Sequence, residues 1–120
     1  MTDAATTPEP SPIPNSEPSA HDALVARIRD LRGIVSNPRN MEAALGIALN
    51  LHAAIHDTPG HMWTERRDGL IRDVLARKAM GLAKYGTTLQ PFNGRIALVD
   101  AYQETLDLLA YLMQAEMETR

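Results

Sequence analysis

The chain has 120 residues, 44% of them hydrophobic, which is enough for one modest domain and too few for two. It contains no cysteine, which excludes disulfides and thiolate metal sites, so any metal must bind oxygen or imidazole. Three of the fifteen acidic residues lie in the first nineteen positions, leaving twelve to balance the twelve Lys and Arg; such a neutral domain is a poor candidate for binding nucleic acid.

Residues 1–19 form a proline-rich segment in which Ile13 is the only large aliphatic residue. This composition cannot bury enough apolar surface to offset the entropy lost on ordering, so we expect a disordered tail. The N-terminus lacks the basic start and apolar core of a signal peptide, and no apolar run approaches the length of a membrane span. We therefore expect a soluble, cytoplasmic protein.

Residues 20–120 are predicted to form one helical domain, because apolar residues recur at intervals of three and four. Ser19 is expected to cap the first helix, and Asn93-Gly94 the fourth. Short connections favour antiparallel neighbours, so the predicted fold is all-α, a small antiparallel four-helix bundle. The predicted helices span residues 20–36, 39–56, 61–83 and 95–118.

The apolar residues on the predicted helices indicate which faces point inward. In the first three helices the expected inward residues are Leu24, Ile28, Leu31 and Val35, then Met41, Leu45, Ala48, His52 and Ile55, then Leu70, Ile71, Val74, Leu75 and Leu82. The fourth helix has a wider arc, covering well over half its circumference: Leu98, Val99, Tyr102, Leu106, Leu108, Leu109, Leu112 and Met113. Because one bundle cannot cover so wide an arc, we expect a homodimer or a larger homo-oligomer.

Three acidic residues of the fourth helix, Asp100, Glu104 and Asp107, fall within about 60° of one another at the α-helical step. Two interpretations are open. The stripe is a solvated or salt-bridged face, with Arg77 of the third helix opposite Glu104 and Asp73 near Asp107. Alternatively it binds Mg²⁺, which prefers carboxylate oxygens together with waters and substrate phosphates.

The segments "KYGTTLQPFNGR" and "LVDAYQETLDLLAYLMQA" bear on this choice. Over residues 77–115 the chain resembles MazG-like all-α nucleoside triphosphate pyrophosphohydrolases of phages and bacteria. That family holds Mg²⁺ on an ExxE pair and a later ExxD pair, and cleaves a nucleoside triphosphate to monophosphate and pyrophosphate. Glu104 and Asp107 match the ExxD pair, with Asp100 one turn earlier. The resemblance implies metal binding, with Mg²⁺ or Mn²⁺, by Asp100, Glu104 and Asp107.

The chain departs from the family in its second predicted helix, where Leu49 and His52 stand at the expected positions of the first acidic pair. The nearest substitutes are Glu65 with Asp68, or Asp73 alone, and Asp73 is the preferred additional catalytic carboxylate. Two functions follow. One is a Mg²⁺-dependent pyrophosphohydrolase; the other is a non-catalytic helical module that binds a nucleotide or a protein.

The loop before the fourth helix carries residue types that suit a nucleotide. Gln90 and Asn93 offer paired donor and acceptor groups for a base or ribose. Arg77, Lys84 and Arg95 suit phosphates, and Tyr85 or Phe92 suits stacking on a base. The alternative is that these residues only turn the chain and cap the helix.

His52 and His56 lie one helical turn apart in the second helix, and His61 follows a turn. This spacing is compatible with zinc. No HExxH pattern accompanies it, and both His52 and His56 fall near the apolar face. We therefore favour partly buried, hydrogen-bonded histidines over a zinc site.

Overall fold

The computed structural model describes residues 12–30 and 40–119. Within these ranges the chain forms helices and no strand, which confirms the predicted all-α fold. Residues 1–11 of the predicted tail and 31–36 of the first predicted helix lie outside the described residues. The four helices are α1 (Ala20–Arg29), α2 (Asn40–His56), α3 (Trp63–Tyr85) and α4 (Ala97–Met117).

The chain divides into two compact units, and each is described by itself. Residues 14–91 form one unit, which contains α1, α2 and α3. The other unit contains α4 and the residues from Phe92 onward, together with Ile13. In the described parts of both units, no helix is long and apolar enough to cross a lipid bilayer.

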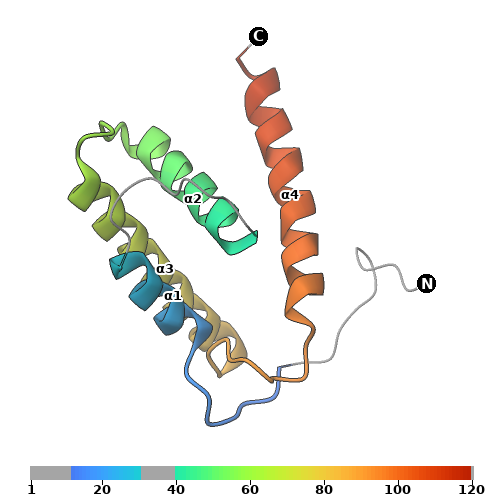
Figure 1. Ribbon diagram of the computed structural model, residues 1–120. Helices are drawn as coiled ribbons and strands as arrows, with labels where there is room; N and C mark the ends of the chain where they lie inside the picture. Colours follow the sequence, from blue (N-terminus) through green and yellow to red (C-terminus); the bar gives the residue numbers. More distant parts are fainter. Residues whose placement is uncertain (1–11, 31–39, 120) are drawn as a thin grey trace. The chain divides into compact units, whose positions relative to one another are not determined.

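In the three-helix unit, α1 and α2 both pack against α3 and run antiparallel to it (Figure 1). The short connection between α2 and α3 produces a helical hairpin, as short helix–helix links favour. The core of this unit combines side chains from all three helices: Val25, Ile28, Leu45, Leu49, Leu70 and Ile71. Burying each of these aliphatic side chains contributes about 1.5–3 kcal/mol.

The predicted inward faces are right for most of the core residues named above and wrong for several other positions. Leu75 and Leu82 of α3 are exposed, and Ile55 of α2 is 77% exposed. Helix α1 reaches α3 beyond Leu75, since Lys78 pairs with Asp22 and the carbonyl of Leu89 accepts from the backbone N–H of Ala20. Leu75 and Leu82 therefore lie on a side of α3 that faces solvent.

Two helix ends behave as their residue types indicate. The Oγ atom of Ser19 accepts hydrogen bonds from the backbone N–H groups of His21 and Asp22, at 3.1 and 3.3 Å, so the predicted N-cap of α1 is confirmed. Helix α3 ends at Gly86, whose φ of 74° is left-handed and whose N–H donates to the carbonyl of Leu82 at 2.9 Å.

The predicted cap of α4 by Asn93 is wrong. The helix begins later, after Ile96, and has no side-chain capping hydrogen bond. Asn93 is instead buried in the preceding turn, where its Oδ1 accepts from the backbone N–H of Arg95 at 3.0 Å. Its carbonyl accepts from the backbone N–H of Ile13 at 2.7 Å. Asn93 therefore organises the loop rather than the helix end.

The chain just before α1 is held by the side chain of Gln90, which follows α3. Its Nε2 donates to the carbonyls of Asn15 and Glu17, both at 2.6 Å, and its Oε1 accepts from the backbone N–H of Asn15 at 3.1 Å. The backbone N–H of Ala20 donates to the carbonyl of Leu89 at 2.6 Å. We call this set of contacts the Gln90 clamp.

Candidate functional site

The acidic stripe predicted on α4 has one paired member and two unpaired members. Asp100 accepts two hydrogen bonds from the guanidinium of Arg95, Nε to Oδ2 at 3.0 Å and Nη2 to Oδ1 at 2.8 Å. This two-pronged geometry is the strong form of an Arg–carboxylate pair. Asp100 is thus neutralised by a cation from the loop five residues earlier, rather than by the pairing of Arg77 with Glu104 that the sequence suggested.

Glu104 and Asp107 are exposed on α4, and neither forms an ion pair or a side-chain hydrogen bond in the part of the chain that the structure describes. They are three residues apart in one helix, so their carboxylates lie on neighbouring positions of one face. The pair of positions that resembles the family's ExxD motif is therefore accessible to a cation from solvent.

The residues predicted to bind substrate fall into two groups. Arg77, Lys84 and Tyr85 are exposed on α3, and the Lys84 ammonium lies 5.1 Å from the centroid of the Tyr85 ring. Gln90 and Asn93 use their amide groups within the chain, as described above. Arg95 is engaged with Asp100. Among these predicted residues, those of α3 present their polar groups to solvent, whereas those of the loop use theirs in contacts within the chain.

Phe92, also predicted as a stacking residue, is 88% exposed at a left-handed backbone position, with φ of 57°. A left-handed φ is uncommon for a bulky side chain. Gly94, two residues later, has φ of 87°. The loop therefore turns sharply at both residues, and most of the Phe92 side chain is exposed to solvent.

The positions of the family's first acidic pair lie in the other unit. Leu49 is 3% exposed and belongs to the apolar core. The nearest acidic substitutes, Glu65 and Asp68, are three residues apart in α3. Glu65 is exposed, whereas the Oδ1 atom of Asp68 pairs with Nε of Arg67 at 3.2 Å.

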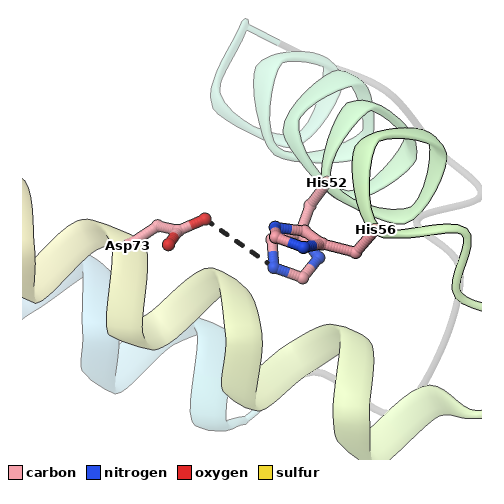
Figure 2. A group of neighbouring side chains, drawn as sticks. All are labelled: His52, His56 and Asp73. Atoms are coloured by element: carbon pink, nitrogen blue, oxygen red, sulfur yellow. Dashed lines mark ion pairs between the residues drawn. The ribbon is translucent and has the colours of Figure 1, made fainter.

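Asp73, predicted as an additional catalytic carboxylate, lies beside two histidines (Figure 2). Its Oδ2 is 3.7 Å from Nε2 of His52, and one ligand atom from each of Asp73, His52 and His56 lies within 4.8 Å of the others. His56 is exposed, contrary to expectation, and His61 is not part of the cluster. We call these three residues the His-His-Asp cluster.

The sequence placed two of the three members of this cluster together. The spacing of His52 and His56 predicts two imidazoles on one helical face. The third member depends on the register between α2 and α3, which no local pattern specifies. The signal in the sequence for the third member was Gly69, one turn before Asp73. Because glycine has no side chain, Gly69 leaves room for an imidazole.

Comparison with protein-family models, with curated proteins and with solved structures gave no match for this chain.

Proposed function

We propose that this protein is a Mg²⁺-dependent nucleotide pyrophosphohydrolase of the MazG-like kind, which converts a (deoxy)nucleoside triphosphate and water to the monophosphate and pyrophosphate. The observation that carries the proposal is the pair of exposed acids in ExxD spacing, Glu104 and Asp107, which form no ion pair within the described residues. It occurs within residues 77–115, the segment that resembles that family. Mn²⁺ is the alternative ion.

The oxygen donors present fit such an ion. Glu104 and Asp107 offer exposed carboxylate oxygens, with no partner to displace among residues 12–30 and 40–119, and Mg²⁺ is commonly held by one or two carboxylates plus waters and substrate phosphates. When bound, the ion would offset phosphate charge and lower the pKa of a coordinated water. Asp100 stays with Arg95, where it holds the loop end of α4 in place. Asp73 is left out, because its carboxylate faces His52.

Arg77, Lys84 and Tyr85 are exposed on α3, in the three-helix unit; as contacts for phosphate oxygens and for the base they remain predictions from the sequence. Arginine and lysine differ in these roles, since Arg binds two oxygens at once and Lys acts as a point charge. These roles rest on residue chemistry and exposure.

The test is turnover of each nucleoside and deoxynucleoside triphosphate with Mg²⁺, measured as released pyrophosphate. We expect activity in the wild type and its loss in Glu104→Gln and Asp107→Asn. Glu116→Gln is the matched control, because Glu116 is also an exposed acid of α4 but lies outside the stripe. Activity retained in all three variants would exclude the proposed metal ligands.

A second function, a non-catalytic nucleotide-binding or protein-interaction module, is favoured by the burial of Leu49. Its position belongs to the hydrophobic core, so this part of α2 cannot supply the family's first acidic pair. Nucleotide binding that depends on Mg²⁺, without release of pyrophosphate, would identify this function.

We further propose that α4 mediates homodimer formation. It has no buried residue, and its exposed side chains include Leu98 at 74%, Tyr102 at 50% and Leu109 at 60%. Large exposed apolar patches on a folded chain mark association surfaces. Light scattering at tens of micromolar should give at least twice the chain mass; a monomer mass would contradict the proposal.

A further inference from the structure

The His-His-Asp cluster joins two helices of the same compact unit. His52 and His56 occupy consecutive turns near the end of α2, and Asp73 reaches toward them from the middle of α3 (Figure 2). The two imidazole centroids are 4.4 Å apart. The arrangement places two nitrogen donors and one carboxylate around a common point.

The position of the His52 ring is fixed by the backbone of α3. A Cβ atom added at Gly69 would overlap the Cε1 and Nε2 atoms of His52. Gly69 is itself buried, one turn before Asp73. The imidazole therefore occupies space that only glycine leaves open, which brings its Nε2 to the Asp73 side chain.

Within the described residues, the protein leaves His52 incompletely satisfied. Its Nδ1 atom is buried without a hydrogen-bond partner. Its Nε2 atom lies 3.7 Å from the Asp73 carboxylate, beyond the 2.7–3.2 Å typical of a hydrogen bond. An ion bound by Nε2 would give that atom a partner, whereas the buried Nδ1 needs one of its own and does not itself point to an ion.

A metal ion between these groups accounts for the spacing. In a tetrahedral site with ligands at about 2.0–2.1 Å, neighbouring donor atoms lie about 3.4 Å apart. The 3.7 Å separation of His52 and Asp73 is close to that value. The three ligand atoms all lie within 4.8 Å of one another, and His56 and Asp73 are exposed, so modest side-chain rotations would bring all three to the spacing of a metal site.

We propose that His52, His56 and Asp73 bind one divalent transition-metal ion of the zinc type, with solvent completing the coordination. Imidazole nitrogen with one carboxylate oxygen suits Zn²⁺ and similar ions far better than Mg²⁺, which prefers oxygen alone. The site is separate from the Mg²⁺ ligands proposed on α4 and does not depend on nucleotide. It ties α2 to α3, so metal binding stabilises the helical hairpin.

The experiment is titration of metal-free protein with Zn²⁺, followed by calorimetry and by thermal unfolding. We expect one ion per chain and a Tm that rises with free Zn²⁺, as linkage requires for a ligand of the folded state. Mg²⁺ at the same concentrations should leave the Tm unchanged. Co²⁺ should give the visible absorption of a four-coordinate site.

The exposed ligands provide the decisive variants. His56→Ala and Asp73→Asn should each weaken Zn²⁺ binding at least tenfold. His61→Ala is the matched control, since His61 is an exposed histidine outside the cluster, and it should bind as the wild type does. Absence of Zn²⁺ binding, or equal losses in His56→Ala and His61→Ala, would overturn the proposal. So would binding that appears only as Zn²⁺-bridged pairs of chains.

Gly69→Ala tests the same site from the side of α3. Its methyl group should displace the His52 ring and weaken Zn²⁺ binding as strongly as loss of a ligand. If this variant fails to fold, His56→Ala still decides the matter, because His56 is exposed and its removal leaves the core intact. Wild-type affinity in a folded Gly69→Ala protein would contradict the proposed geometry.

Discussion

The two longest helices, α3 and α4, differ in what they bury. Helix α3 carries many charged residues, yet it buries Arg66, Gly69, Leu70 and Ile71. Helix α4 is rich in Leu, Tyr and Met, yet it buries none of its residues. The contrast shows that burial is decided by the helices that pack on a segment, rather than by the apolar content of the segment itself.

The difference extends to polar side chains. In α3, the buried guanidinium of Arg66 donates one long hydrogen bond, at 3.4 Å, to Oδ1 of Asn50. In α4, the exposed Glu104 and Asp107 are fully available to solvent or a ligand. Core formation therefore constrains α3, whereas the residues of α4 can be used for binding.

The largest expected effect comes from truncating one apolar residue in each region. Ile28 is 0% exposed in the core around α3, so Ile28→Ala should lower the free energy of unfolding by about 2–5 kcal/mol. Leu109 of α4 is 60% exposed, so Leu109→Ala should change it by about 0.5 kcal/mol or less. Urea denaturation followed by circular dichroism measures both, at a concentration low enough for light scattering to give the monomer mass, so that the proposed α4 dimer does not contribute. Equal losses would show that α4 is covered in solution.

Arg66→Met should raise the free energy of unfolding, by about 1 kcal/mol or more. Its Nε is buried without a partner in the described residues, and a buried charge lacking an opposite charge costs stability that an apolar side chain of similar length does not. Arg72→Met on the exposed side of α3 is the control, with an expected change within about 0.5 kcal/mol. Destabilisation in Arg66→Met alone would reveal that its guanidinium has a compensating anion.

The paired and unpaired acids of α4 should respond differently to neutralisation in metal-free protein. Asp100→Asn breaks the bidentate contact with Arg95 and should cost about 0.5–1 kcal/mol. Glu104→Gln should leave the Tm unchanged or slightly raised, since it removes repulsion and no partner. Thermal unfolding with a chelator compares them. A drop of several degrees for Glu104→Gln would mean that this acid serves the fold.

The smallest expected effect concerns pH. The pKa of His21 lies below its ordinary value of 6.5, chiefly because burial disfavours the imidazolium, with repulsion from Lys78 and Arg77 adding to this and Asp22 opposing it. The unfolded chain therefore binds the proton more readily, so this contribution to stability is present above pH 6.5 and is lost as pH falls from there to the folded-state pKa.

Denaturation at several pH values tests this sign. His21→Gln should show a smaller loss of stability below pH 6.5 than the wild type, and His61→Ala, which changes an exposed histidine, should follow the wild type. An unchanged slope in His21→Gln would assign the pH dependence to other groups.

Local patterns predicted the features that depend on neighbours in sequence. The four helices, the Ser19 cap and the core positions Ile28, Leu45 and Leu70 follow from helical periodicity and capping chemistry. Leu75 was misplaced, since periodicity cannot show which apolar side chains a packing partner covers.

The candidate sites were predictable to different degrees. The ExxD spacing of Glu104 and Asp107 is visible in the sequence because it lies within one helix. The pairing of Asp100 with Arg95 requires the loop conformation set by the Asn93 turn. The contact of His52 with Asp73 requires the register of α2 on α3 and the absent side chain of Gly69. Composition and residue spacing do not specify contacts between different elements, so these two pairings could not be predicted from the sequence.

The Gln90 clamp has an architectural consequence. It brings the beginning and the end of the segment 14–91 to the same place, so the polypeptide of this unit closes on itself without a covalent link. Segments whose ends adjoin at a surface tolerate excision, insertion into another host chain and circular permutation better than segments whose ends are far apart. We therefore expect the three-helix segment to keep its helical hairpin and core when it is inserted into another chain or when its termini are relocated.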